Sequence, residues 1–244
     1  MGRHFEVRQA SMQKTALKKS KVYSRYGKEI YIAAKAGIPN PEMNQGLKQK
    51  IAEAKSNQVP AHVIDNAIKK AQGNTGEHYE TARYEGFGPG ESTILVDCLT
   101  DNLNRSLSDV RTCFNRAKAK MGSQGSVSFL YDQYGQFVFK YDNLETVMER
   151  LFDAEIEVEE LEQEAEYINV LVQPHHFGLT RQALDGLLGE DYEYEVNEIG
   201  MFPQALTKIE DPADLEVFKK LVDMLEEVDD VQKVYHNVEN MNEA

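Results

Sequence analysis

The sequence predicts an α+β protein in which a helical N-terminal part is followed by an acidic part of alternating strands and helices. Two observations support this class. Residues 1–73 hold 14 Lys and Arg against 5 Asp and Glu, whereas residues 74–244 hold the remaining 13 basic and 36 acidic residues. The spacing of apolar residues also changes near residue 76, from helical steps of three and four to short strand-like runs. The net charges of the two parts, +9 and −23, favour binding of a polyanion by the N-terminal part.

The composition is typical of a globular protein, with 41% hydrophobic and 28% charged residues. The 244 residues are enough for one large domain or for two to three small ones. No apolar run approaches the roughly 20 residues needed to cross a bilayer, and the first residues contain no apolar signal segment. We therefore expect a cytoplasmic protein with no membrane partner. Cys98 and Cys113 are expected to be reduced core thiols.

The basic part is predicted to form a bundle of three helices. Apolar residues at helical spacing indicate helices over residues 14–37, 42–57 and 60–72. Gly and Pro separate these helices, because Gly suits the end of a helix and Pro cannot continue one. The residues expected to point inward from the second helix are Met43, Leu47, Ile51 and Ala54.

Basic side chains follow one face of the first predicted helix. They are offset by two positions, or about 200°, from an apolar stripe of Tyr23, Tyr26, Ile30, Ala33 and Gly37, so the two sets lie on opposite sides. We interpret the cations of the bundle as a phosphate-binding surface, because ordinary solubilising helices intersperse Lys with Glu. The candidate residues are Lys14, Lys18, Lys21, Arg25, Lys28, Lys35, Lys48, Lys69 and Lys70.

The acidic part is predicted to contain two α/β domains, one inserted in the other. The inner one has the β-α-β-β-α-β order of a ferredoxin-like fold, with elements at 136–140, 144–152, 156–161, 167–172, 179–188 and 192–196. The outer one has strands at 80–85, 92–99, 127–131, 205–209 and 231–235 and helices at 102–120 and 215–226. The predicted domains are residues 1–76, residues 77–132 with 203–244, and the inserted residues 133–202.

No motif gives a positive reason to expect an enzyme. Residues 86–90 read G-x-G-P-G rather than the nucleotide-binding G-x-G-x-x-G, and they join two predicted strands, which favours a hairpin turn. His175 and His176 are adjacent and have no third ligand at metal spacing. The acidic run 155–166 alternates with apolar residues, as in a strand with one solvated face. We expect no catalytic residue, no metal and no cofactor.

A second group of cations lies on the helix predicted over residues 102–120. This basic island in an otherwise acidic part of the chain consists of Arg105, Arg111, Arg116, Lys118 and Lys120. Two interpretations fit them equally well. They are counter-charges on a helix surface and at its C-terminal end, or they are a second contact to the same nucleic acid.

Several motifs, taken together, resemble those of the YebC/PmpR family, and the resemblance covers essentially the whole chain. They are MGRH at 1–4, EIYIAAK at 29–35, VIDNAIKKA at 63–71, YEGFGPG at 84–90, LTDNLNR at 99–105, GSQGSVSF at 122–129 and DDVQKVYHNV at 229–238. The last motif and EIYIAAK look most like the YeeN branch. Two segments depart from the family pattern: FEVRQ at 5–9 replaces the usual SKWAN, and AKM at 119–121 replaces a Gly-Gly.

The resemblance implies a helical domain and two α/β domains, with the third inserted in the second. It also implies a cytoplasmic DNA-binding transcriptional regulator. By similarity to the mitochondrial translational activator of cytochrome c oxidase, the alternative is a ribosome-associated factor that binds ribosomal RNA or tRNA and relieves stalling at proline-rich stretches. A protein-interaction adaptor is a further alternative, although it leaves the charge of +9 unexplained. No recognition helix or dimerisation heptad is evident, which leans toward RNA and favours a monomer.

Overall fold

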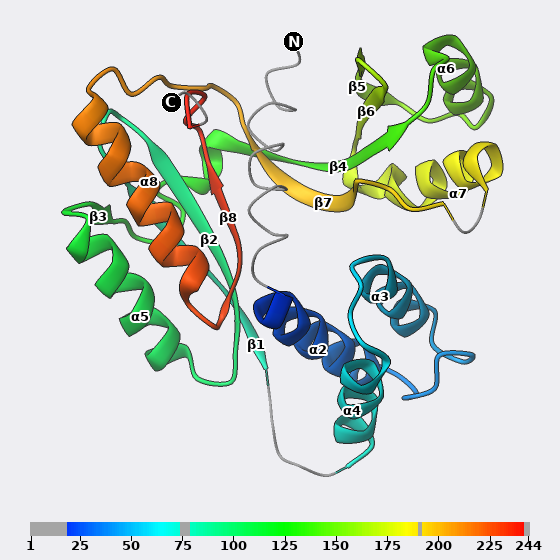
Figure 1. The fold of residues 1–244 in the computed structure, drawn as a ribbon, viewed down its shortest axis with the longest axis horizontal. Coiled ribbons are helices and arrows are strands. Elements are labelled where there is room, and N and C mark those ends of the chain that lie inside the picture. Colours follow the sequence, from blue (N-terminus) through cyan, green and yellow to red (C-terminus); the bar gives the residue numbers. More distant parts are fainter. Residues whose placement is uncertain (1–18, 74–78, 190–191, 242–244) are drawn as a thin grey trace. The chain divides into compact units, whose positions relative to one another are not determined.

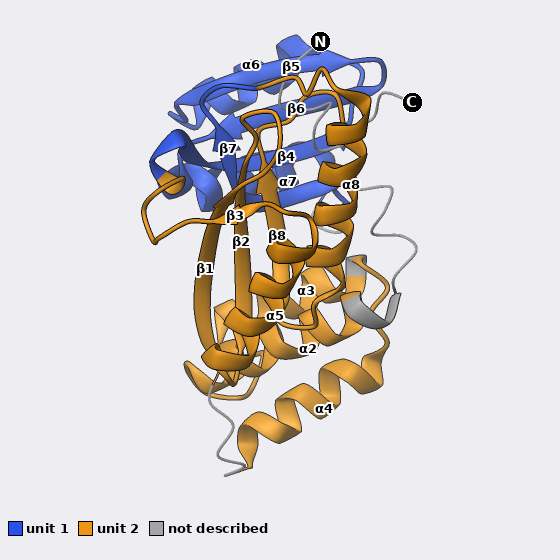
Figure 2. Ribbon diagram, turned by 90° about the vertical axis from the view of Figure 1, so that its left-hand side faces the viewer, with its two compact units in different colours: residues 1–8, 129–206 blue, residues 9–128, 207–244 orange. Residues whose placement is uncertain are grey.

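The computed structural model describes residues 19–73, 79–189 and 192–241 (Figure 1). The described residues fall into two compact units (Figure 2). One unit comprises residues 129–206, and the other is built from the two segments on either side, up to residue 128 and from residue 207. We describe each unit by itself.

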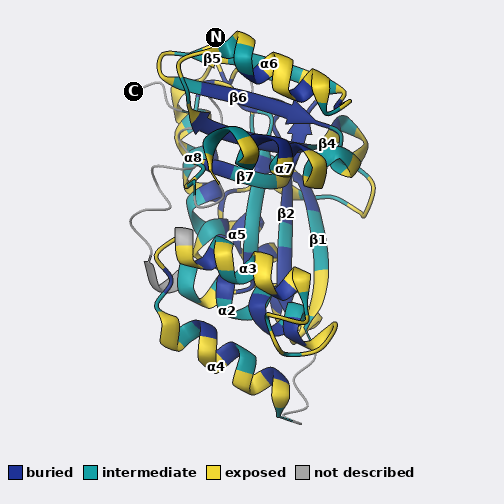
Figure 3. Ribbon diagram, turned by 90° about the vertical axis from the view of Figure 1, so that its right-hand side faces the viewer, coloured by how far each residue is buried: buried dark blue, intermediate teal, exposed yellow. Residues whose placement is uncertain are grey.

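Three helices form a bundle within the two-segment unit: α2 (Lys19–Lys35), α3 (Gln45–Ser56) and α4 (Ala61–Gln72). The Asn44 side chain caps α3 by accepting a hydrogen bond from the Leu47 N–H. Pro60 precedes α4, as the sequence predicts. Figure 3 shows exposed residues on the outward surfaces of α3 and α4. The core of the bundle contains Tyr26, Ile30, Tyr31, Ala34, Leu47, Ala54, Val59, Ile64, Ala67 and Ala71.

The apolar stripes predicted for these helices are largely confirmed, with three differences, the first being that Gly37 is exposed beyond the end of α2. Met43 is 67% exposed rather than inward, because α3 begins at Gln45 and Met43 lies in the turn before it. Ala33 is only half-buried, and its neighbour Ala34 takes the core position. The candidates Lys14 and Lys18 lie outside the described residues.

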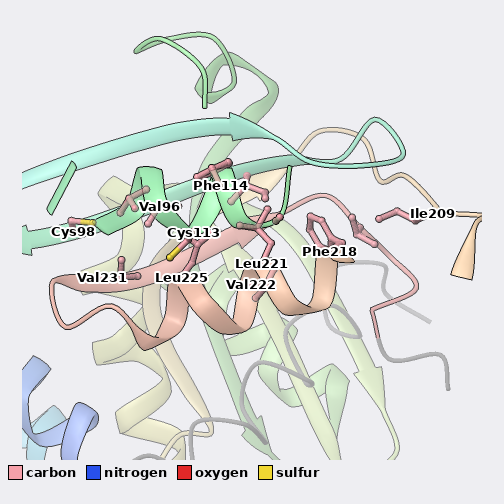
Figure 4. Packing of buried hydrophobic residues seen from close by; sticks show 14 residues of the cluster. Val96, Cys98, Cys113, Phe114, Ile209, Phe218, Leu221, Val222, Leu225 and Val231 are labelled. Atoms are coloured by element: carbon pink, nitrogen blue, oxygen red, sulfur yellow. The ribbon is translucent and has the colours of Figure 1, made fainter. Parts of the chain in front are cut away.

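The same unit contains a four-stranded antiparallel sheet in the order β3-β1-β2-β8. Its strands are β1 (Glu80–Phe87), β2 (Thr93–Thr100), β3 (Lys120–Met121) and β8 (Val231–His236). Helices α5 (Leu103–Arg116) and α8 (Pro212–Glu227) pack against it. Figure 4 shows side chains of the strands and of both helices, among them Val96, Phe114 and Phe218, meeting in one core.

Gly86 allows β1 to pack closely against Phe114 of α5 in this core. A Cβ atom at Gly86 would lie 2.2 Å from a ring carbon of Phe114 and 2.9 Å from the backbone oxygen of Lys120. The predicted hairpin is present, since β1 and β2 pair from Glu80 with Thr100 to Phe87 with Thr93.

Two strands predicted for this unit are wrong. Residues 128–130 form a 3₁₀ turn, η1 (Ser128–Leu130), and the short strand β3 takes the edge of the sheet instead. Near residues 205–209 the backbone makes one isolated bridge, between Thr207 and Val238. Val127 and Ile209 are buried in these two places, but the backbone N–H of each donates to a side chain rather than to a neighbouring strand.

The other unit contains the second four-stranded antiparallel sheet, in the order β5-β6-β4-β7. Its elements follow the predicted β-α-β-β-α-β order. They are β4 (Tyr131–Lys140), α6 (Leu144–Asp153), β5 (Val158–Glu164), β6 (Tyr167–Val172), the 3₁₀ turn η2 (Pro174–His176), α7 (Phe177–Leu188) and β7 (Val196–Pro203). The α+β class, with three N-terminal helices and two such sheets, is therefore confirmed.

Strand β7 starts where the predicted strand, residues 192–196, was expected to end. The alternating tyrosines before it are packed rather than paired in the sheet. The Tyr194 ring meets the rings of Phe137 and Phe139 edge-on at centroid distances of 5.9 Å, and its hydroxyl donates to Asp185 Oδ1 at 2.8 Å. None of the described helices is long and apolar enough to span a bilayer.

Candidate nucleic-acid interface

Three exposed lysines lie in the last turns of α2 and α4, two helices that pack against each other. We call Lys35, Lys69 and Lys70 the terminal lysine cluster. Lys35 Nζ donates to the carbonyl oxygen of Gly73 at 3.3 Å, and the Gly73 N–H in turn bonds to the carbonyls of Lys69 and Lys70. Part of this charge stabilises the helices, because cations favour the negative end of the helix dipole. The three side chains are also exposed to solvent.

On α3 the structure separates an available lysine from an engaged one. Lys48 is exposed. Lys50 Nζ lies 3.2 Å from Glu29 Oε2 and 2.7 Å from Glu53 Oε2. Burial acts to lower the pKa of Lys50, but the two carboxylates outweigh it and hold that pKa above its ordinary value. Lys50 therefore joins α2 to α3 inside the bundle.

The predicted row of cations along α2 is not an open row. Arg25 is half-buried, with its guanidinium 4.8 Å from the centre of the Tyr26 ring and its Nε 3.7 Å from Glu29 Oε1. Lys28 donates a hydrogen bond to the buried carboxylate of Asp230. Of Lys21 only the backbone is described, in α2. Lys35 is thus the cation of this stripe that the structure shows exposed.

Lys28 and Arg105 meet at one buried carboxylate, that of Asp230, whose side chain is 4% exposed. Lys28 Nζ donates to Asp230 Oδ1 at 3.0 Å, and Arg105 donates to Oδ2 through Nη2 at 2.8 Å and Nε at 3.2 Å. The Thr100 hydroxyl adds a hydrogen bond of 2.8 Å to Oδ2. We call Lys28, Thr100, Arg105 and Asp230 the Asp230 cluster. Burial acts to raise the pKa of Asp230, but the hydrogen bonds from Arg105, Lys28 and Thr100 outweigh it and lower that pKa.

Arg111 and Arg116 are exposed on α5. Arg111 and Leu107 form one wall of an open groove of about 370 Å³, which Arg83 and Tyr84 of β1 and the loop residue Gln124 also line. Arg83 is held by Asp97 through two hydrogen bonds, at 2.6 and 2.8 Å.

Glu85 fixes the loop at this groove. Its side chain accepts hydrogen bonds from the backbone N–H groups of Gly125 at 2.7 Å, Val127 at 2.6 Å and Ser128 at 2.9 Å. Glu85 is 2% exposed. Burial acts to raise its pKa, but the three N–H donors outweigh it and hold that pKa below the ordinary range. Three hydrogen bonds to one carboxylate therefore hold this loop at the groove that Arg111 lines.

Comparisons with known protein families give two matches, which lie between residue 3 and residue 238 of the chain. Residues 3–74 match the TACO1/YebC protein N-terminal domain, and residues 79–238 match the TACO1/YebC second and third domain. The chain belongs to the TACO1/YebC family.

Relatives of this TACO1/YebC protein match it over nearly its whole length. Proteins from Vibrio campbellii and a Marinomonas species, each described as a probable transcriptional regulatory protein, are 51% and 48% identical over 98% of this chain and 100% of theirs. The fold is similar to that of a conserved hypothetical protein, Aq1575 from Aquifex aeolicus. That crystal structure gives a TM-score of 0.77 and 31% identity over 91% of this chain and 90% of the other.

The sequence did not point to Asp230 or Glu85 as site-forming residues of this TACO1/YebC protein. Both occur in the motifs that carry the family resemblance, at 229–238 and 84–90. A carboxylate within a motif that carries the family resemblance was the available signal, but its partners lie far away in the sequence.

In the described part of this TACO1/YebC protein, no three His, Cys, Asp or Glu residues are grouped so as to hold a metal ion. His175 and His176 contact each other, with ring centroids 4.2 Å apart. Cys98 and Cys113 are free, buried thiols. Burial raises the pKa of Cys98 to about 11, which disfavours the reactive thiolate.

Proposed function

We propose that this protein is a cytoplasmic, non-enzymatic regulator of gene expression that binds nucleic acid through phosphate contacts. The observation that carries the proposal is the terminal lysine cluster, on a bundle segment with a net charge of +9. Exposed ammonium groups displace condensed counterions from a phosphate backbone, which supplies affinity without requiring a particular base sequence. The relatives described as probable transcriptional regulatory proteins support this assignment.

Two further surfaces fit the same function. Lys48 on α3 is exposed within the bundle, and Arg111 and Arg116 are exposed on α5. Arg111 beside the groove is suited to a second phosphate, because a guanidinium donates to two oxygens of one phosphate group. The proposed contacts are thus the terminal lysine cluster, Lys48, Arg111 and Arg116.

The names of the relatives favour DNA as the target, whereas the distribution of cations favours structured RNA as a second candidate. The terminal lysine cluster lies at the C-terminal ends of α2 and α4, although Lys48 lies in the first turn of α3, while a DNA recognition helix places its base contacts near its N-terminus. Sedimentation of polysomes with and without nuclease separates these targets. Co-migration with ribosomes that survives physiological salt would favour the ribosomal role, and its absence would favour DNA.

We also propose the three-domain division of residues 1–76, 77–132 with 203–244, and 133–202, with a ferredoxin-like fold for both α/β domains. The two family matches, which separate at residues 74–79, support the first boundary. The strand order β5-β6-β4-β7 supports the fold of the inserted domain.

Charge reversal of the terminal lysine cluster should weaken nucleic-acid binding. In the triple variant Lys35→Glu, Lys69→Glu and Lys70→Glu we expect the dissociation constant to rise at least about tenfold at 0.1 M salt, because each lost phosphate contact removes counterion release. Fluorescence anisotropy with labelled duplex DNA and with an RNA hairpin measures this change.

The matched control is Lys220→Glu, which reverses an exposed lysine on α8, outside the bundle. This variant should bind nucleic acid with an affinity within about twofold of the wild-type value, since that helix lies in the acidic part of the chain. If the loss of binding free energy per reversed charge is the same in the control and in the triple variant, only net charge matters. That result would refute the proposed surface.

A further inference from the structure

We propose that Asp230 is a positioning residue that fixes the helical bundle on the sheet β3-β1-β2-β8, so that the cations of the bundle and of α5 bind as one surface. This inference rests on the proposed function for its binding consequence. It changes the role of two candidates: Lys28 and Arg105 hold the Asp230 cluster together, and Lys28 does not contact phosphate.

The Asp230 cluster joins three separate parts of the unit. Lys28 comes from the middle of α2, Arg105 from the first turn of α5, and Asp230 from the turn that precedes β8. Thr100 ends β2, where its hydroxyl bonds to the same carboxylate oxygen as Arg105. One carboxylate therefore connects the bundle to two strands and a helix.

Lys28 has no donor left for a phosphate. An ammonium group has three N–H donors. Lys28 Nζ donates to Asp230 Oδ1 at 3.0 Å, to the carbonyl of Asp229 at 3.1 Å and to the carbonyl of Leu99 at 3.3 Å. With its side chain only 14% exposed, Lys28 is directed at the sheet rather than at solvent.

Arg105 is committed in part, through its Nε and Nη2, and its side chain is 47% exposed. Its guanidinium bonds to Asp230 and also to Asp101, with Nη2 2.6 Å from Asp101 Oδ1. The side chain of Asn102 accepts from the backbone N–H of Arg105 and so fixes the start of α5 beside the cluster. Two cations that bond to one buried carboxylate allow only a narrow set of positions of α2 relative to α5, because charge-assisted hydrogen bonds are directional.

The link that the Asp230 cluster makes between bundle and sheet matters because helices α2, α3 and α4 pack mainly against one another, around their own core. A few strong contacts then decide how the bundle sits on the sheet. If both surfaces touch one nucleic acid, fixing the bundle raises the effective concentration of the second contact once the first has formed. Loosening the bundle should weaken binding without removing any phosphate contact.

The test compares Lys28→Met with Lys48→Met. Both variants remove one ammonium group from the bundle, and Lys28→Met leaves Asp230 paired with Arg105 and Thr100. For Lys28→Met we expect the dissociation constant to rise at least about tenfold while the slope of log K against log salt stays at the wild-type value, since every contact can still form. Lys48→Met should reduce the steepness of that slope by about 0.9, the value for one lost phosphate contact.

Hydrogen exchange in the absence of nucleic acid tests the positioning role separately. Amides of α2 and β8 should exchange faster in Lys28→Met than in wild type. In Lys48→Met their exchange rates should equal those of wild type. Asp230→Asn should behave like Lys28→Met, with Asp229→Asn as its control, because the structure uses only the backbone carbonyl of Asp229 in the cluster.

The inference is overturned if Lys28→Met binds like wild type, or if its salt slope becomes less steep by about one unit, which would make Lys28 a phosphate contact. Unchanged exchange in α2 and β8 would overturn it as well. A wild-type protein that binds no nucleic acid would refute the proposed function, and the exchange data would still decide whether Asp230 positions the bundle.

Discussion

Replacing Ile30 with alanine is expected to lower the free energy of unfolding by about 2–5 kcal/mol. The Ile30 side chain is 0% exposed and packs in the core of the bundle. Truncation removes buried methyl groups and leaves a cavity that the surrounding helices fill only in part. Denaturant unfolding followed by far-ultraviolet circular dichroism measures the change.

Ile38 is the matched control for this prediction, because it is 50% exposed in the turn after α2. Ile38→Ala should change the free energy of unfolding by less than about 1 kcal/mol. A wild-type unfolding midpoint for Ile30→Ala would mean that the apolar stripe of α2 does not form the core of the bundle.

Glu85→Ala should lower the free energy of unfolding by about 3 kcal/mol or more. The carboxylate holds three backbone N–H groups, and hydrogen bonds to charged groups contribute about 1.5–3 kcal/mol each when measured singly. Without it the loop over residues 122–128 loses its anchor. Glu80→Ala, at the exposed start of the same strand, is the control and should have a small effect.

Acid pH should reproduce part of this loss. The pKa of Glu85 in the folded protein lies below its ordinary value of 4.5. The stability that Glu85 contributes is therefore present above that ordinary value and is lost as the pH falls through the lowered folded value. Glu85→Gln, which lacks this titration, should lose less stability than wild type between about pH 4.5 and pH 2. Equal acid sensitivity in both proteins would contradict the assignment.

The helical bundle and the order of elements in the inserted unit could be predicted because local patterns determine them. Apolar spacing placed Tyr26, Ile30 and Ile64 in the core, and Pro60 marked the start of α4. Each of these signals depends on residues within one or two helical turns.

The two wrong strands show where local patterns fail. Val127 is fully buried, yet its N–H donates to the Glu85 carboxylate. Ile209 is buried too, but its N–H and its carbonyl both bond to the side chain of Asn240. Burial made these segments resemble strands, while side chains from distant positions took the backbone hydrogen bonds that a sheet would have required.

The sequence predicted the positive charge of the candidate site, but it did not predict which cations pair with a carboxylate. Counting cations drew attention to Lys35, Lys69 and Lys70, which are exposed. The same count included Lys28 and Arg105, which meet Asp230 across separations of 202 and 125 residues. No periodicity links positions so far apart, so only the folded chain could distinguish cations that hold a buried carboxylate from cations that are exposed.

The central claim is that the exposed cations bind nucleic acid through its phosphates, and salt titration of the full chain tests it most directly. The association constant for one duplex DNA and one RNA hairpin is measured between 50 and 200 mM salt. The terminal lysine cluster and Lys48 offer four cations, so we expect log K to fall linearly with log salt at a slope of about −3 or steeper for the preferred target. A slope near zero for both ligands would contradict the claim.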